Sequence, residues 1–159
     1  MKPIKNAYVG QENYNCIGCS PDNPIGIKLS FTLDEETQTV LAEWTPNFNY
    51  QGFYNVVHGG IQATLLDEIA SWVLYTVLGT GGVTSQMQIR YHKPVFITKG
   101  TIKLKARMEK HHKRLADIKT ELYNSDGELC TEATVQYFVY PEEIAKKKYG
   151  YPGKEAFID

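Results

Sequence analysis

The most apolar stretch of the chain reads VVHGGIQATLLDEIASWVLYTVL and runs from Val56 to Leu78. It contains no proline, and Gly79 follows it as a natural helix stop. Large apolar residues recur in it at helical spacing: Ile61, Leu65, Ile69 and Trp72. We therefore predict one long helix over about 58–78. Asp67 and Glu68 interrupt the apolar run near its middle, so we expect no membrane span here.

Alternation of apolar and polar residues predicts strands on both sides of this helix. Before it, runs at 27–33 and 39–44 flank a polar turn and predict a hairpin. After it come four further runs, which we expect to form consecutive antiparallel strands: 83–91, 102–109, 115–123 and 128–140. One helix and about six strands predict an α+β domain, in which a curved antiparallel sheet wraps around the single central helix.

Length and composition limit the class of protein. The chain has 159 residues, of which 42% are hydrophobic and 22% charged, and this suits one folded domain. We expect that domain to span residues 27–140. An irregular segment rich in turn residues, 1–26, would pack on it, and the tail 141–159 would add one helical turn and then fray.

Charge and cysteine content indicate partners and compartment. Seventeen Lys and Arg against eighteen Asp and Glu leave a net charge of −1, so we expect no nucleic-acid partner and no membrane partner. No apolar run follows the charged start of the chain, so no secretion signal is expected. Three cysteines are odd in number and too few for a disulfide framework. The sequence therefore predicts a reduced, cytoplasmic protein.

Asp67 lies on an unusual side of the predicted helix. It is opposite the large apolar residues, and except for the bulky Leu74 and Leu78 its neighbours on that side are small: Gly60, Ala63, Thr64, Ala70 and Ser71. A solvent-facing side normally carries cations, yet no Lys or Arg occurs from Gly52 to Ile89. An ordinary solvent face and a surface packed against another chain or a ligand are both open, and the missing cations favour the second. Asp67 is then a candidate base or nucleophile, and Glu68, about 100° further round, is the less favoured carboxylate.

The start of the helix offers backbone amides. Gly59 and Gly60 let a ligand approach the backbone closely, and the first helical turn leaves N–H groups unpaired. Such an end can bind an oxyanion or a carbonyl oxygen, although a structural cap explains the glycine pair equally well. His58 suits a structural task there, bonding the backbone and fixing the turn, better than a role as general base.

Gly59 and Asp67 are too far apart to touch one substrate carbonyl from the same helix. Eight residues separate them, which is about 12 Å of helix. If both act on that carbonyl, they come from different subunits, with two antiparallel helices around a twofold axis. Each dimer would then hold two composite sites.

These residues also carry a family signature. The sequence HGGIQATLLDE, 58–68, resembles the helix motif of hotdog-fold thioesterases of the phenylacetate-pathway, or PaaI-like, type. YQG at 50–52 and CIGCSPDNPIGI at 16–27 resemble a subgroup of that family, so the likeness spans about 14–140. The resemblance implies the hotdog fold, hydrolysis of acyl-CoA thioesters without a cofactor, and a homodimer or a dimer of dimers.

By position, the resemblance also implies site residues. Asp67 takes the carboxylate role, the amide of Gly59 the oxyanion-donor role, and Gly60 supports the turn. Thr84 falls where relatives place a hydroxyl that orients the water or the carboxylate. Asp67 would deprotonate a water held by Thr84, or attack the thioester directly and form an anhydride.

This chain departs from the family pattern in its substrate contacts. Relatives often carry Asn or Gln about six residues before the histidine, where this chain has Gly52, so Gln51 and Asn55 are the nearby candidates. Ser85 is an alternative to the neighbouring threonine. The predicted site comprises catalytic Asp67, Gly59 and Thr84, and the substrate-binding residues His58, Gly60, Gln51, Asn55, Glu68 and Ser85.

Two further clusters have plainer interpretations. Cys16-x-x-Cys19 is a lone pair without a second pair at metal-ligand spacing, so we expect a packed turn, no metal site and no thioredoxin-like redox role. A basic cluster predicts a solvated face, or a site for the phosphates of coenzyme A. It comprises Lys103, Lys105, Arg107, Lys110, His111, His112, Lys113 and Arg114.

Two other functions remain open beside thioester hydrolysis. A non-catalytic acyl-CoA-binding module would keep the cleft without turnover, although the carboxylate of Asp67 argues against it. A hotdog dehydratase or hydratase would act on acyl thioesters without releasing the thiol, and would need a catalytic histidine paired with a carboxylate in a different arrangement.

Overall fold

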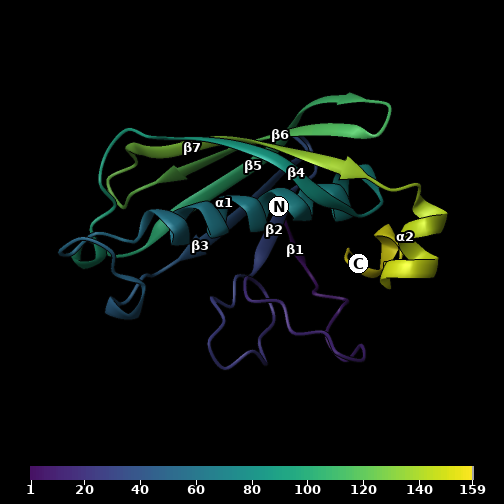
Figure 1. Ribbon diagram of the computed structural model, residues 1–159, viewed down its shortest axis with the longest axis horizontal. Coiled ribbons are helices and arrows are strands. Elements are labelled where there is room, and N and C mark those ends of the chain that lie inside the picture. The colour runs from purple at the N-terminus through teal and green to yellow at the C-terminus, as the bar shows by residue number, and fades with distance from the viewer. Residues whose placement is uncertain (159) are drawn as a thin grey trace.

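The helix expected over 58–78 is present at the centre of the molecule (Figure 1). The computed structural model describes residues 1–158; α1 spans Gly59–Val73 and continues into a π-helical segment, η2, at Leu74–Leu78. Gly79 ends the helix with a φ of 85°, a left-handed conformation that glycine adopts without strain. Within these described residues, none of the helices has the length and apolarity needed to cross a membrane.

Within residues 1–158, seven strands form one antiparallel sheet. They are β1 Lys2–Ile4, β2 Phe31–Asp34, β3 Thr39–Trp44, β4 Gly82–Tyr91, β5 Ile102–His112, β6 Leu115–Tyr123 and β7 Leu129–Val139. Their order across the sheet is β1-β2-β3-β5-β6-β7-β4. The sheet curves around α1 (Figure 1), so the predicted hotdog architecture is confirmed.

The expectation that the later strands are consecutive is wrong for β4. This strand follows α1 in the chain but pairs with β7 at the far edge of the sheet, and β5 pairs with β3 and β6. The chain therefore enters α1 from the β3 side and leaves it on the β4 side, and the helix covers the strands between. The link from β4 back to β5 contains η3, Ile97–Lys99.

The core lies between α1 and the concave face of the sheet. The helix buries large side chains that are at most 1% exposed: Leu65, Leu66, Ile69, Trp72 and Val73. Alternate residues of the central strands meet them: Leu104, Ala106, Ile118 and Val135. Burial of each large apolar side chain stabilises the folded state by about 1.5–3 kcal/mol. These side chains therefore determine which side of α1 faces the sheet. Asp67 is left at the margin of this contact.

The N-terminal segment is less irregular than expected. Residues 2–4 form β1, which pairs with β2 at the edge of the sheet, and an edge strand is where a proline such as Pro3 is tolerated. The strand expected over 27–33 begins only at Phe31, because Lys28 has a φ of 61° and an extended strand cannot include that conformation.

The C-terminal tail does not fray, which corrects that expectation. It forms α2, Glu142–Tyr149, and then η4, Lys154–Ala156, and folds back beside the N-terminal segment (Figure 1). Tyr151 and Phe157 are 3% and 0% exposed, and the ring of Phe157 stacks on Tyr75 with 5.9 Å between centroids. These aromatic anchors hold the tail. The division of the chain into 1–26, 27–140 and 141–159 stays a prediction.

Candidate active site

Asp67 points from α1 toward the beginning of β4. Its Oδ1 accepts a hydrogen bond from Thr84 Oγ1 at 2.7 Å. The hydroxyl of Tyr137 lies 2.9 Å from the same Oδ1 and 2.6 Å from the backbone oxygen of Asp67. Thr84 and Tyr137 are paired residues of β4 and β7, so both side chains leave the sheet on one face. Two hydroxyls from adjacent strands thus fix one carboxylate oxygen.

Tyr137 is a stable hydrogen-bond donor. Burial raises the pKa of its hydroxyl well above the usual value, and the negative charge of Asp67 adds to the effect. Asp67 itself is half-buried, and its Oδ2 accepts no hydrogen bond from any residue in 1–158. Oδ2 is therefore the oxygen that a water or a substrate can reach.

The first turn of α1 leaves the Gly59 amide free within residues 1–158. His58 is the N-cap, and its Nδ1 accepts the hydrogen bond of the Gly60 amide at 2.9 Å. The Gly59 carbonyl accepts from the Tyr91 hydroxyl at 2.7 Å, whereas the Gly59 amide has no acceptor among the described residues. A cavity of about 270 Å³ adjoins Gly59 and Tyr91. Of the two glycines, Gly59 is thus the one whose N–H can serve a ligand.

A buried glutamine holds this turn in place. Gln62 is 3% exposed; its Nε2 donates to the Val57 carbonyl at 2.8 Å, and its Oε1 accepts from the Thr131 hydroxyl of β7. Val57 N also donates to the Val95 carbonyl at 2.9 Å. The backbone leading into Gly59 is therefore tied to the sheet rather than free to move with the loop before it.

The other predicted substrate contacts serve the loop itself or stand apart. Gln51 Oε1 accepts from the backbone N–H of Asn55 at 2.8 Å, and the side-chain Nδ2 of Asn55 donates to the Thr98 hydroxyl at 2.8 Å. Ser85 is exposed at a β-bulge between the paired residues Thr84 and Gln86, and it has no side-chain hydrogen bond within residues 1–158. Their predicted substrate roles stay predictions.

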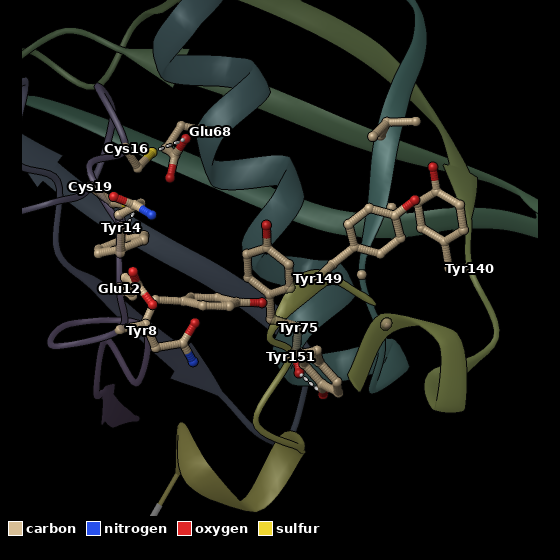
Figure 2. A pocket seen from close by; sticks show the side chains of 16 residues that line it. Tyr8, Glu12, Tyr14, Cys16, Cys19, Glu68, Tyr75, Tyr140, Tyr149 and Tyr151 are labelled. Carbon is tan, nitrogen blue, oxygen red and sulfur yellow. Dashed lines mark hydrogen bonds between the residues drawn. The ribbon is translucent and has the colours of Figure 1, made fainter. Parts of the chain in front are cut away.

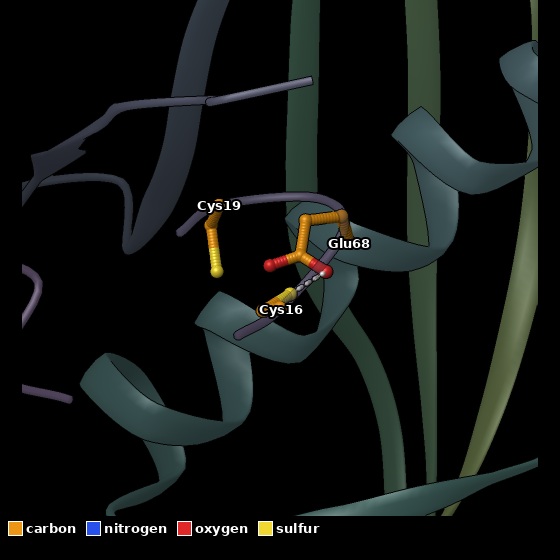
Figure 3. A group of neighbouring side chains, drawn as sticks. All are labelled: Cys16, Cys19 and Glu68. Carbon is orange, nitrogen blue, oxygen red and sulfur yellow. Dashed lines mark hydrogen bonds between the residues drawn. The ribbon is translucent and has the colours of Figure 1, made fainter. Parts of the chain in front are cut away.

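Glu68 points toward the N-terminal loop that carries Cys16 and Cys19 (Figure 3). Its Oε2 accepts from Cys16 Sγ at 3.4 Å, and its Oε1 accepts from Trp72 Nε1 at 3.1 Å. A hydrogen bond from Cys19 lowers the pKa of the Cys16 thiol, and the same bond together with burial raises the pKa of Cys19. The structure thus places the two helix carboxylates in separate environments.

A cavity of about 350 Å³ lies beside this cysteine–glutamate group (Figure 2). Tyrosines from the N-terminal segment, η2 and the C-terminal region dominate its wall: Tyr8, Tyr14, Tyr75, Tyr140, Tyr149 and Tyr151. Burial raises the pKa of Tyr8 and Tyr75, so these rings keep their hydroxyl protons. The wall is aromatic, with Glu68, Cys16 and Cys19 as its polar end.

The basic cluster lies on exposed positions of β5 and of its turn to β6. Lys103 Nζ is 3.8 Å from Glu43, and Lys105 Nζ lies 5.2 Å from the ring centre of Tyr123. An exposed ion pair such as that of Lys103 with Glu43 contributes about 0–1 kcal/mol to the stability of the folded protein. This exposure agrees with both predicted roles of the cluster, a solvated face and a site for the phosphates of coenzyme A, and both stay predictions.

Sequence reasoning missed three residues that shape the site: Gln62, Tyr91 and Tyr137. One signal for Tyr137 was present, because it shares an inward alternation with Ala133, Val135 and Val139, and a phenol among such residues needs a hydrogen-bond acceptor. Gln62 had a similar signal as an amide near apolar helix positions. Nothing local pointed to Tyr91.

Known proteins resemble the chain in sequence and fold. The family model described as Thioesterase superfamily matches residues 54–131. A crystal structure of a thioesterase superfamily protein is similar with a TM-score of 0.69 and 24% identity, over 74% of this chain and 57% of that one. This chain therefore spans less than two thirds of that protein.

Two streptococcal structures are also similar. A hypothetical thioesterase from Streptococcus pneumoniae TIGR4, solved with coenzyme A, has a TM-score of 0.61 and 25% identity, over 65% of this chain and 82% of that one. The protein smu.793 from Streptococcus mutans UA159, bound to acetyl CoA, has a TM-score of 0.67 and 19% identity, over 84% of this chain and 98% of that one. No curated protein sequence matches.

Proposed function

We propose that this protein, whose segment 54–131 belongs to the thioesterase superfamily, hydrolyses acyl-CoA thioesters to a free acid and coenzyme A. The observation that carries the proposal is the carboxylate of Asp67, which two hydroxyls hold by one oxygen while the other stays open. Coenzyme A and acetyl CoA, present in the two streptococcal relatives, support a CoA thioester as substrate.

Thioester hydrolysis requires an activated water and a donor for the oxyanion that forms. Asp67 Oδ2 accepts a proton from water as the water oxygen attacks the thioester carbon. A backbone amide, that of Gly59, donates to the carbonyl oxygen, which becomes negative in the tetrahedral intermediate. The carbon–sulfur bond then breaks, and the proton on Asp67 passes to the leaving thiolate, which restores the carboxylate.

Thr84 and Tyr137 position the carboxylate in this scheme. Both hydrogen bonds end on Oδ1, so they orient Oδ2 and limit rotation of the group. The alternative is direct attack of Asp67 on the thioester, with an anhydride that water then hydrolyses. Single-turnover hydrolysis in water enriched in heavy oxygen separates the two, because only the anhydride route transfers a protein oxygen to the acid.

The proposal includes a homodimer that completes the site. Gly59 and Asp67 lie at opposite parts of one helix, about 12 Å apart along its axis. β4 is an edge strand of ten residues, and among the described strands it pairs only with β7, so its other edge is open to a second copy. Val83 and Tyr91 on it are 51% and 48% exposed. An antiparallel pair of α1 helices then sets each Gly59 against the Asp67 of the other subunit.

Free cysteines at positions 16, 19 and 130 support the further proposal that the protein acts in the reducing cytoplasm. The main test is chromatographic detection of coenzyme A released from a panel of short, long and aromatic acyl-CoA substrates. Chromatography avoids thiol reagents, which would also react with the half-exposed Cys16. We expect release with the wild-type protein and not with the Asp67→Asn variant.

Two results would replace the proposal. A mass change of an unsaturated acyl-CoA without thiol release would identify a hydratase or a dehydratase. Saturable binding of acyl-CoA with no turnover over the whole panel would identify a non-catalytic binding module.

A further inference from the structure

We propose that Cys16, Cys19 and Glu68 bind one zinc ion, at a site that does not depend on the thioester chemistry above. Three donor atoms, one sulfur from each cysteine and one carboxylate oxygen, all lie within 4.8 Å of one another. Figure 3 shows the three side chains converging between the N-terminal loop and α1. The cysteine pair alone predicts a packed turn; the fold adds the third donor.

The spacing of the donors suits tetrahedral zinc. Bonds of about 2.3 Å to sulfur and about 2.1 Å to oxygen place neighbouring donors about 3.6–3.8 Å apart. Cys16 Sγ and Glu68 Oε2 are 3.4 Å apart, and no donor pair exceeds 4.8 Å. The site therefore closes on the ion with a movement of at most about 1 Å, within reach of small side-chain rotations. Two thiolates also favour zinc over magnesium or calcium.

The loop that carries the cysteines is shaped to meet the carboxylate. A Cβ at Gly18 would lie 2.5 Å from Glu68 Oε2, so a larger residue at this position would push the Glu68 side chain away from the loop. Each donor is also oriented by a neighbour, as metal ligands usually are. The neighbours are the Gly18 amide at 3.3 Å from Cys16 Sγ, Trp72 Nε1 at 3.1 Å from Glu68 Oε1, and the Tyr14 hydroxyl at 2.9 Å from Cys19 Sγ.

A fourth ligand has room to bind. All three donor residues line the tyrosine-walled cavity of about 350 Å³, so water or a small anionic ligand completes the tetrahedron from that side (Figure 2). Binding breaks two S–H bonds and releases both protons to the buffer, with no change of oxidation state. The ion fastens the N-terminal loop to α1 through Glu68, the residue that follows Asp67.

The test is cobalt substitution in the full-length, fully reduced protein after removal of bound metal with a chelator. We expect one equivalent of Co²⁺ to produce a sulfur-to-cobalt charge-transfer band and the intense visible bands of a tetrahedral site, and Zn²⁺ to displace it. Cys16→Ser and Cys19→Ser should each weaken binding by more than about 100-fold. Cys130→Ser, which alters the remaining cysteine, should leave the spectrum unchanged.

Gly18→Ala is a second test, in case the cysteine variants do not fold. It keeps all three donors but forces Glu68 away from the loop, and we expect affinity to fall by about 10-fold. Reduced protein with three titratable thiols and no charge-transfer band would overturn the proposal, as would a band that survives in Cys16→Ser. These readouts are spectroscopic, so their outcome does not depend on whether the protein hydrolyses thioesters.

Discussion

Thr84 and Tyr137 face each other across β4 and β7 and meet at the same oxygen of Asp67, at 2.7 Å and 2.9 Å. One strand of this pair follows the helix directly, and the other is the last strand of the sheet. Their pairing sets the carboxylate at the open edge of the sheet and leaves its second oxygen free. The position of Asp67 is thus a consequence of strand order.

Asp67→Asn tests the carboxylate directly. The amide cannot accept the proton of an attacking water, so we expect turnover to fall by about two to four orders of magnitude. An amide oxygen can still accept from Thr84 and Tyr137, and the thermal midpoint should change little. Released coenzyme A measures the first effect and calorimetry the second. Activity within a few-fold of wild type would remove Asp67 from the mechanism.

Thr84→Val removes the hydroxyl and keeps the shape of the side chain. A hydrogen bond to a charged group contributes about 1.5–3 kcal/mol, so we expect turnover to fall by about 10- to 100-fold. Thr84→Ser keeps the hydroxyl and should retain most of the activity. A valine variant with wild-type activity would show that this hydrogen bond does not contribute to turnover.

Tyr137→Phe should destabilise the protein at pH 7 by about 1–3 kcal/mol, since it removes the hydroxyl that donates to the carboxylate and to the backbone oxygen of Asp67. The folded-state pKa of Tyr137 is raised above the value of the unfolded chain, so the folded protein holds this proton more tightly. Wild type therefore loses that contribution as the pH rises above the unfolded value of about 10. Denaturant unfolding measured from pH 7 to above pH 10 should show that the difference in the free energy of unfolding between wild type and variant becomes smaller as the pH rises. A constant difference would contradict the role given to burial.

Local sequence patterns predicted much of this fold because helical spacing and strand alternation are local properties. The strand at 115–123 has the predicted bounds, and the helix has the predicted start and stop. Alternation does not specify which strands pair, so the place of β4 beside β7 was missed. The same limit hid Tyr137 as a partner of Asp67, and Glu68 as a neighbour of Cys16, since 70 and 52 residues separate these contacts.

Gly59→Pro tests the oxyanion amide, because proline lacks the N–H and is favoured at the first position of a helix. His58 has φ −52° and ψ 135°, an extended conformation that a following proline accepts. We expect folded protein with turnover lower by about 100- to 1000-fold. Gly59→Ala is the control, because its Cβ meets Tyr91 Oη at 3.4 Å and its amide remains. If both variants lose activity equally, turnover depends on the space at position 59 and not on its N–H.

Mixing the Asp67→Asn and Gly59→Pro proteins tests whether each site is shared between subunits. In a composite dimer, a mixed pair holds one site with both substitutions and one site with neither, because the aspartate of one chain works with the glycine of the other. Random exchange of equal amounts makes half of the dimers mixed, so activity should recover to about a quarter of wild type. Coenzyme A release after co-refolding measures this recovery, and each variant refolded alone supplies the baseline. No recovery, with mixed dimers demonstrated by mass spectrometry, would place Gly59 and Asp67 of one chain in the same site and contradict the antiparallel arrangement of α1.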